Sequence, residues 1–330
     1  MMLLKFAIRR AMFTVTASAA VAASVAYSGA ARAAEGKSVV LLSPTEECTY
    51  CADYVRFFRT AAAKKGLKLE ITTSPFDPAN QANQVEQAIA KKPDAIVLWP
   101  VDANALVPSM RKIKQAGIPL VISDAPPNAQ SERFWDVFTG GDNVAVGKQS
   151  AQAMVGAFKA KGLGTEGDIF AITGTPGTPT SIIRMESFKQ ELAAIAPGIK
   201  IVGEQPGNWD QSVATDAAAA LFTKFGPSIK GVYSVEDVMM AGVIVAAQRA
   251  GIDPGKLALV GVGCELPGYN NIESGVQYAT VLFDARSDAL YAVNAVSDLL
   301  NGKTQEKYVY FPVPVVTKDN LSVCNAALGK

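Results

Sequence analysis

The stretch PDAIVLWPVDANALVPSMRKIKQAGIPLVISD, residues 93–124, contains the repeating unit from which the chain is built. Its two apolar runs, Ala95 to Trp99 and Pro119 to Ser123, are short and hydrophobic at consecutive positions. Such runs are typical of parallel strands that are covered by helices on both faces. The intervening residues near 103–116 predict a helix, which ends where Gly117 precedes the next strand. This stretch therefore predicts one strand–helix–strand unit of a parallel sheet.

The same alternation continues from Ser38 to the end of the chain, without a linker or a low-complexity segment. The expected strands are Val39 to Ser43, Leu67 to Thr73, Ala95 to Trp99, Pro119 to Ser123, Asp168 to Thr173, Ile199 to Glu204, Gly231 to Ser234, Leu257 to Val262, Ala279 to Phe283 and Val309 to Val316. The expected helices lie near 51–65, 79–92, 103–116, 145–161, 179–195, 211–224, 237–250 and 285–300.

One pass along the chain gives two doubly wound halves, which separate near residues 139–143. The predicted fold class is therefore α/β, with two doubly wound parallel-sheet lobes joined by hinge strands. The expected boundaries are 36–141 plus 284–311 for lobe one and 142–283 plus 312–330 for lobe two.

Residues 1–33 have the composition of a signal peptide that is removed on export. Arg9-Arg10 precedes an apolar, Ala-rich stretch, and small residues then allow cleavage after Ala33 or Ala34. No cysteine follows this site, so a lipid anchor is not indicated. The expected location is the periplasm, and the arginine pair leaves both the general and the twin-arginine export route open.

The composition of the chain excludes several classes of function. The 330 residues are 49% hydrophobic and 18% charged, carry a net charge of +1 and include no histidine. No run of Lys and Arg exceeds a pair, so neither nucleic acid nor an anionic membrane surface is an expected partner. The absence of histidine excludes Ser-His-Asp and Cys-His catalysis and His-ligated zinc. These exclusions remove most hydrolase mechanisms.

Residues that close the strands are the candidate ligand-binding residues, because ligands of doubly wound sheets bind beyond the carboxyl ends of the strands. They are Ser43, Trp99, Asp124, Thr173, Gly203, Glu236, Asp237, Cys264, Glu265 and Phe283. Aromatic faces that pack on C–H groups, together with carboxylates that bind hydroxyls, suit a small polyhydroxylated ligand. Structural roles stay open as alternatives to ligand binding. Trp99 and Phe283 could be core residues, and Asp124 and Asp237 could be helix or turn caps. Arg184 could form an ion pair at the surface.

The order and spacing of several segments resemble the periplasmic sugar-binding proteins of the ribose/galactose-binding type, the receptor components of ABC importers. The segments are Pro93 to Leu98 with Pro100 to Asp102, Gly117 to Asp124, Gly141 to Asn143, Arg184 with Phe188, Gln205 to Asp210, and Glu236-Asp237. The resemblance covers the chain beyond residue 33. It implies a type I periplasmic binding fold, a monomer without a cofactor, a sugar or polyol ligand between the lobes, and an ABC permease in the inner membrane as partner.

The resemblance also implies roles for individual residues. Asp124 matches the family's aspartate at the end of the fourth strand, Arg184 its guanidinium, and Trp209 its stacking aromatic. Tyr50 is the expected aromatic of the first loop. Phe283 stands where relatives have Gln or Asn, so the pocket is expected to be more aromatic than a pentose or hexose site. This departure leaves the identity of the ligand open.

The four cysteines of an exported protein are expected to be oxidised. The expected pairs are Cys48 with Cys51 and Cys264 with Cys324, because the other two pairings would crosslink the lobes and resist hinge motion. Cys48-Thr-Tyr-Cys51 also allows a periplasmic thiol-disulfide oxidoreductase, since a helix N-terminus lowers a thiol pKa. Thioredoxin-like domains are much shorter and need a mixed sheet, which argues against this alternative.

The sequence therefore predicts a carrier rather than an enzyme: the solute-binding protein of an ABC importer. A sensory receptor of the same fold, which delivers its ligand to a chemotaxis or kinase ectodomain, stays open as an alternative. A lac-repressor-like regulator shares the fold, but the signal peptide occupies the position of its DNA-binding headpiece.

Overall fold

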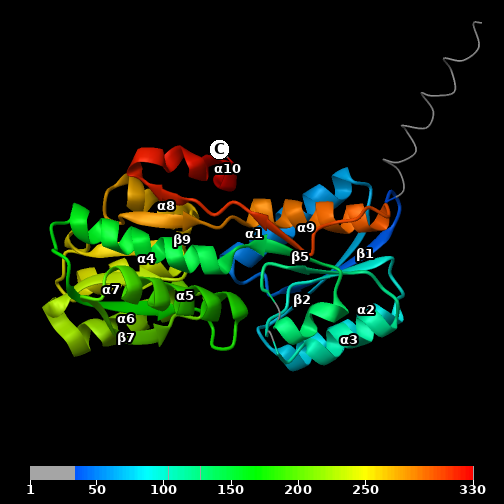
Figure 1. The fold of residues 1–330 in the computed structure, drawn as a ribbon, viewed down its shortest axis with the longest axis horizontal. Helices are drawn as coiled ribbons and strands as arrows, with labels where there is room; N and C mark the ends of the chain where they lie inside the picture. Colours follow the sequence, from blue (N-terminus) through cyan, green and yellow to red (C-terminus); the bar gives the residue numbers. More distant parts are fainter. Residues whose placement is uncertain (1–33, 103, 127, 330) are drawn as a thin grey trace, which may run out of the picture.

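Two α/β bodies lie side by side in the protein, each built around its own sheet (Figure 1). The structure is a computed structural model, which describes residues 34–102, 104–126 and 128–329. The predicted signal peptide, residues 1–33, lies outside the described residues. Within the described ranges, no helix combines the length and the apolar character that a membrane crossing requires.

The first sheet contains six strands in the order β11-β5-β4-β3-β1-β2, and all of its neighbouring strands are parallel. They are β1 (Ser38–Pro44), β2 (Lys68–Ser74), β3 (Ala95–Leu98), β4 (Leu120–Ser123), β5 (Val137–Gly141) and β11 (Tyr308–Phe311). The helices of this body are α1 (Thr49–Lys64), α2 (Pro78–Ala90), α3 (Val107–Gln115) and α9 (Ala285–Leu300).

The second sheet also contains six strands, in the order β12-β10-β9-β8-β6-β7, with β12 antiparallel to β10. They are β6 (Gly167–Thr173), β7 (Ile199–Pro206), β8 (Ile229–Ser234), β9 (Ala258–Gly263), β10 (Ala279–Leu282) and β12 (Val315–Thr317). Its helices are α4 (Asn143–Ala160), α5 (Pro179–Ile195), α6 (Gln211–Phe225), α7 (Asp237–Arg249), α8 (Leu266–Glu273) and α10 (Asn325–Leu328).

The strands are hydrophobic at consecutive positions because both faces of each sheet are covered. In β1, Val39 and Leu41 pack into a core with α1 and α9, whereas Val40 and Leu42 pack into a second core with α2 and α3. A strand that is buried on both faces needs apolar side chains on both. The predicted fold class, two doubly wound parallel sheets, is confirmed.

The chain passes between the two sheets three times, after β5, after β10 and after β11. An aspartate starts the helix after each of the first two crossings. Asp142 accepts hydrogen bonds from the backbone N–H groups of Val144 and Ala145, and Asp284 accepts one from Ser287. These N-caps fix the point at which each helix begins, directly beside the crossing.

The structure corrects three expected elements. Residues 309–316 were expected as one strand but form β11 and β12 in different sheets, because Pro312 and Pro314 lie where the chain crosses. The strand β5 was not expected, since its Gly-Gly end is typical of a turn. The helix α8 was not expected either, because its Leu-Pro-Gly start lacks a helical pattern.

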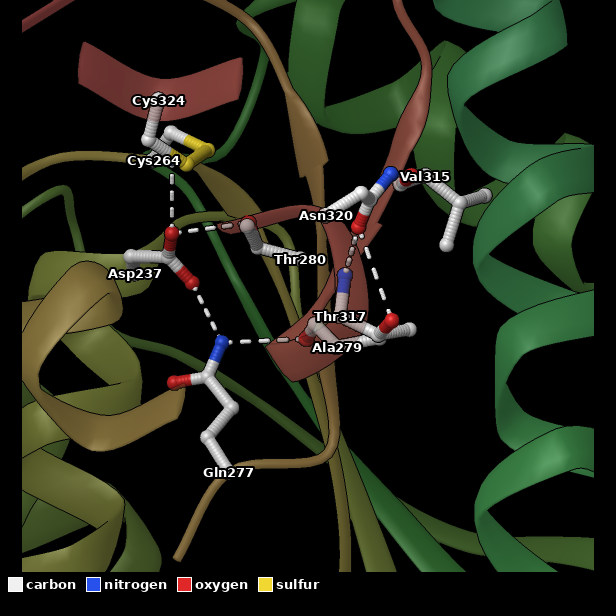
Figure 2. Close-up of a disulfide and its surroundings, with 9 residues drawn as sticks. All are labelled: Asp237, Cys264, Gln277, Ala279, Thr280, Val315, Thr317, Asn320 and Cys324. Carbon is white, nitrogen blue, oxygen red and sulfur yellow. Dashed lines mark hydrogen bonds between the residues drawn. A yellow bond between two sulfur atoms is a disulfide. The ribbon is translucent and has the colours of Figure 1, made fainter. Parts of the chain in front are cut away.

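The C-terminal segment is tied to the second sheet (Figure 2). The η4 turn (Lys318–Cys324) follows β12, and Asn320 Oδ1 accepts a hydrogen bond from the Thr317 N–H at 2.8 Å. Cys324 is bonded to Cys264, which follows β9, with their Cα atoms 5.6 Å apart. This pair therefore lies within one body and leaves the crossings unlinked.

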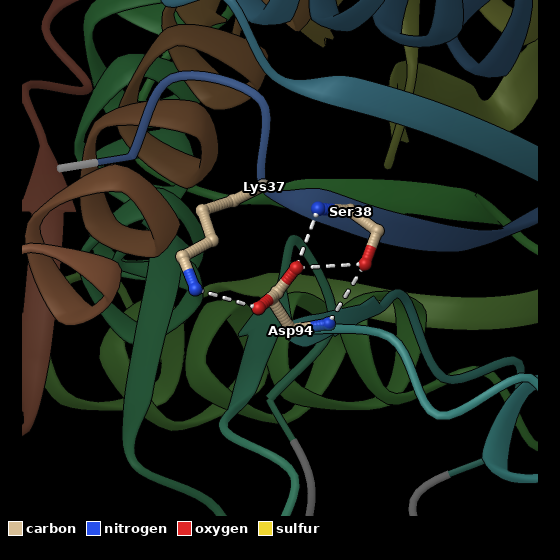
Figure 3. A network of polar contacts seen from close by, with 3 residues as sticks. All are labelled: Lys37, Ser38 and Asp94. Atoms are coloured by element: carbon tan, nitrogen blue, oxygen red, sulfur yellow. Dashed lines mark hydrogen bonds and ion pairs between the residues drawn. The ribbon is translucent and has the colours of Figure 1, made fainter. Parts of the chain in front are cut away.

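A polar cluster fixes the amino ends of two central strands of the first sheet (Figure 3). Asp94, just before β3, accepts hydrogen bonds from the Ser38 N–H and hydroxyl at 2.8 Å each, and from Lys37 Nζ at 2.9 Å. The hydrogen bond with Lys37, followed by those with Ser38, lowers the pKa of Asp94 to about 2. The carboxylate stays ionised at physiological pH and holds β1 and β3 in register.

Candidate functional site

A cavity lies where the carboxyl ends of the two sheets face each other, and both bodies contribute to its lining. Most of the predicted site residues line it, namely Tyr50, Trp99, Asp124, Arg184, Trp209, Glu236, Glu265 and Phe283. Strand-end residues meet there because parallel strands present their carboxyl ends at one edge. The structure thus brings these eight side chains together from distant parts of the sequence.

Five of the strand-end candidates lie outside the cavity lining, namely Ser43, Thr173, Gly203, Asp237 and Cys264. Ser43 is fully buried within β1, which continues through Pro44. Asp237 points away from the cavity and accepts hydrogen bonds from the Cys264 N–H at 2.8 Å, from Gln277 Nε2 at 2.7 Å and from the Thr280 hydroxyl at 2.7 Å (Figure 2). Its carboxylate connects α7 to β10 and to the disulfide loop, so it supports the wall of the site.

Arg184, on α5, is held in a fixed orientation beside the cavity. Its Nε donates to Asn143 Oδ1 at 2.8 Å, and its Nη1 donates to the Val235 carbonyl at 2.9 Å. The guanidinium also lies over the ring of Phe283, 4.2 Å from the centroid. Described residues accept from two of the five guanidinium N–H groups in this way, so the other donors are available to a ligand.

Asp124 lies at the end of β4, with a left-handed backbone (φ 60°) that turns its side chain into the site. Beneath it lies Asp288 of α9, which accepts hydrogen bonds from the Tyr50 hydroxyl at 3.2 Å and from the Ser123 hydroxyl at 3.3 Å. Burial raises the pKa of Asp124 to about 6, against the charge of Arg184. Burial, and then the charge of Asp124, raise the pKa of Asp288 well above its usual range.

Glu236 and Glu265 form an acidic wall on the other side of the cavity, next to α7 and α8. Burial raises the pKa of Glu236 to about 8, because the opposing charge of Arg184 only partly offsets it. Burial and the neighbouring Glu236 charge raise the pKa of Glu265 well above its usual range. Oε2 of Glu236 and both carboxyl oxygens of Glu265 accept no hydrogen bond from another described residue, although the Glu265 carboxyl group interacts with its own backbone N–H.

Aromatic side chains cover the rest of the lining. Tyr50 meets Trp99 edge-on, with ring centroids 5.8 Å apart, and Phe283 at the same distance. Trp209 lies against the backbone of Gly174, where an added Cβ would stand 2.0 Å from its ring. The Trp209 Nε1–H is buried without a partner. Flat apolar faces with unused polar atoms are suited to a ligand that is itself both apolar and hydroxylated.

The Cys48–Cys51 pair also borders the cavity, with Cα atoms 5.2 Å apart. Cys48 is the N-cap of α1, and its Sγ accepts a hydrogen bond from the Cys51 N–H at 3.2 Å. The pair therefore fixes the first turn of α1, which carries Tyr50. Among the described residues, no group of His, Cys, Asp and Glu side chains is arranged to hold a metal ion.

Sequence reasoning missed residues that lie on helices or in loops away from strand ends. They are Asp288 and Asn143, which hold Asp124, Tyr50 and Arg184 in place, and Phe76, Thr178 and Thr180, which line the cavity. Asp288 lies on a helix face with Ala285, Ala289 and Ala292. The position of Asp288, as an acidic residue in an otherwise apolar stripe of a helix, could have indicated a functional role, because a buried carboxyl group needs partners.

Residues 39–304 match the family model described as periplasmic binding protein domain. The chain is 31% identical over 273 residues to the D-ribose/D-allose-binding protein of Pseudomonas aeruginosa, an alignment that covers 78% of this chain and 79% of that protein. It is 29% identical over 268 residues to the xylitol-binding protein of Mycolicibacterium smegmatis, an alignment that covers 80% of this chain and 72% of that protein.

Solved structures give the same result. An ABC transporter solute-binding protein from Agrobacterium vitis with bound D-fucose superimposes with a TM-score of 0.79 at 27% identity, over 86% of this chain and 96% of that chain. A galactofuranose-binding protein has a TM-score of 0.82 at 23% identity, over 89% of this chain and 99% of that chain, and supports the fold alone. These relatives are substrate-binding proteins and not enzymes.

Proposed function

This chain belongs to the periplasmic binding protein family, and we propose that it is the solute-binding component of an ABC importer for a small sugar or polyol. The observation that carries the proposal is the lining of the cavity between the sheets. Tyr50, Trp99 and Trp209 offer aromatic faces, while Asp124 and Arg184 offer charged hydrogen-bonding groups from opposite bodies. Rings that pack on C–H faces and charged groups that bind hydroxyls are the two requirements of a sugar site.

The proposed mechanism is closure of two lobes around the ligand. The proposed lobes are residues 36–141 plus 284–311 and residues 142–283 plus 312–330, and the three crossings of the chain between the sheets support these bounds. A ligand that contacts both lobes binds the closed form more tightly than the open form. It therefore shifts the population toward the closed form, which an ABC permease of the inner membrane would recognise.

The proposed setting is the periplasm, reached through a signal peptide that is cleaved after Ala33 or Ala34. Family members work outside the cytoplasm, as the family description states, and the composition of residues 1–33 supports export. A monomer suffices for this function, since both walls of the cavity come from one chain.

The proposal is tested by thermal shift of the chain without residues 1–33, against pentoses, hexoses, deoxy sugars and polyols. A ligand at about 100 times its dissociation constant stabilises the folded state by about 2.7 kcal/mol, so a specific ligand separates clearly from the panel. The site is then assigned by fluorescence, since the chain has three tryptophans. The ligand-induced change should persist in Trp135→Phe and be reduced in Trp209→Phe, where Trp99, the other tryptophan of the lining, contributes the remainder. No stabilisation by any compound would contradict the proposal.

A further inference from the structure

The cavity is lined by more carboxyl groups than a neutral ligand requires. Three carboxyl side chains, Asp124, Glu236 and Glu265, line it together with one guanidinium, that of Arg184. Asp124 already has partners, because it interacts with the Asp288 and Tyr50 side chains beneath it. The carboxyl groups that a neutral ligand does not require are therefore those of Glu236 and Glu265.

These two glutamates have unused hydrogen-bonding atoms at the cavity. Glu236 is only 7% exposed, and its Oε2 has no partner in the described structure. Glu265 Oε1 and Oε2 also lack partners on other described residues, although both atoms are buried. Buried polar atoms are seldom left unpaired, and an unpaired carboxylate is costly. Three acceptor oxygens at the cavity thus lack donors.

Arg184 does not supply those donors. Its Nε and Nη1 are bound to Asn143 and to the Val235 carbonyl, and its plane lies over Phe283. Its charge acts on both glutamates at a distance, but it forms no hydrogen bond with either among the described residues. A bound molecule can supply these donors.

The backbone is adapted to hold the acidic wall in place. Gly263 has a φ of 135°, and an added Cβ there would stand 2.0 Å from Glu265 Oε2. The Glu265 carboxyl group thus folds back against a position that only glycine can occupy. Because the charge of Glu236 acts on Glu265, the two carboxyl groups form one local patch.

We propose that the ligand carries an ammonium group, as in an amino sugar or an amino polyol, and that this group binds between Glu236 and Glu265. An ammonium group has three N–H donors and no acceptor, and the three unpaired oxygens can all accept from it once both carboxyl groups are ionised, so its binding releases the protons that the two glutamates hold in the free protein. The ring of Trp209 lines the same cavity, and aromatic faces attract cations. Asp124 and Arg184 then bind the hydroxyls. The inference rests on the proposed function and narrows its ligand class.

Calorimetry with matched sets of compounds tests the inference. The sets are D-glucosamine, D-glucose and N-acetyl-D-glucosamine; the three corresponding galactose compounds; and 1-amino-1-deoxy-D-glucitol with D-glucitol. At least one amine should bind at least about 30-fold more tightly than its neutral partners, as expected for a buried charge-assisted contact. Glu236→Gln and Glu265→Gln should each remove most of this preference, so that the amine and its neutral partner bind with similar affinity.

The control is Glu186→Gln, which removes an exposed acid on α5, the helix of Arg184. It should change neither affinity, and melting curves of all variants verify that they fold. Neutral compounds that bind as tightly as their amines would overturn the inference and leave the proposed function standing. Binding by none of these compounds, while a neutral sugar or polyol of the thermal-shift panel binds, would overturn the inference alone.

Discussion

The guanidinium of Arg184 lies over the ring of Phe283, with its Cζ 4.2 Å from the ring centroid. Arg184 belongs to the second body, and Phe283 lies at the end of β10, where the chain crosses to the first. Tyr50, from the first body, contacts the same ring, with centroids 5.8 Å apart. Phe283 therefore connects the charged group of one wall to the aromatic group of the other, directly at a crossing.

Gly141→Ala should disturb this connection. Gly141 ends β5 beside another crossing, and an added Cβ would stand 2.2 Å from the Phe283 ring. The ring must then move from beneath Arg184, so ligand affinity should fall by about tenfold and the melting temperature should drop, as for an overpacked core. Gly255→Ala is the control, because its Cβ would approach only Asp253, at 3.2 Å. Normal binding by Gly141→Ala would show that the stacking is dispensable.

Asp124→Asn should weaken binding without destabilising the free protein. The ligand would lose a charged acceptor, which costs about 2 to 3 kcal/mol, or about 30- to 150-fold in affinity. The melting temperature should stay the same or rise, since the substitution removes a carboxylate that is costly to bury. Titration calorimetry and thermal melting measure the two effects, with the exposed Asp216→Asn as control. A large loss of stability with unchanged affinity would make Asp124 a structural residue.

The stability of the free protein should fall as pH rises. The pKa of Glu236 is about 8 in the folded state, against an ordinary value of 4.5, so the folded state binds more protons between these values. The free energy of unfolding therefore decreases with pH across this window, and Asp124, with a folded pKa of about 6, acts in the same direction. The melting temperature should be about 5 °C lower at pH 9 than at pH 6.

Glu236→Gln should flatten this pH profile, whereas Glu186→Gln should retain it. Thermal melts from pH 5 to pH 9 without ligand make the comparison. A wild-type melting temperature that rises with pH would contradict the assignment of Glu236 as a buried acid whose pKa is raised.

How far the sequence predicts the site depends on which atoms a local pattern controls. Strand ends can be predicted from the sequence, because consecutive hydrophobic residues mark each strand. Trp99, Asp124 and Phe283 of the cavity lining were predicted in this way. Which of two neighbouring residues beyond a strand end points into the cavity cannot be predicted from the sequence. Glu236 and Asp237 are neighbours, yet Glu236 lines the cavity and Asp237 binds Gln277 behind it.

The support beneath the site depends on contacts between segments that are distant in the chain. Tyr50 and Asp288 are separated by 238 residues and meet only because α1 packs on α9. The register of those two helices is a tertiary property, which no local pattern contains. The sequence likewise did not predict the crossing after β11. Residues 309–316 have the composition of one strand, but their two halves join different sheets.

The disulfides should map as Cys48 with Cys51 and Cys264 with Cys324. Non-reducing peptide mapping of the exported protein checks the pairs. Cys264→Ser with Cys324→Ser opens a loop of 60 residues, and the chain-entropy account gives a loss of about 4 kcal/mol in unfolding free energy. Cys48→Ser with Cys51→Ser should cost much less, because its loop is short. A peptide that links Cys48 or Cys51 to Cys264 or Cys324 would refute the pairing.

The most direct test of the account is calorimetric titration of wild-type protein and Trp209→Ala with the compound that gives the largest thermal shift. The wild type should bind one sugar or polyol, neutral or amino, per chain. The Trp209→Ala variant should bind it at least about tenfold more weakly, because the ligand loses a buried aromatic face. Equal affinity of the two proteins, with both fully folded, would place the ligand outside the cavity between the sheets and contradict the account.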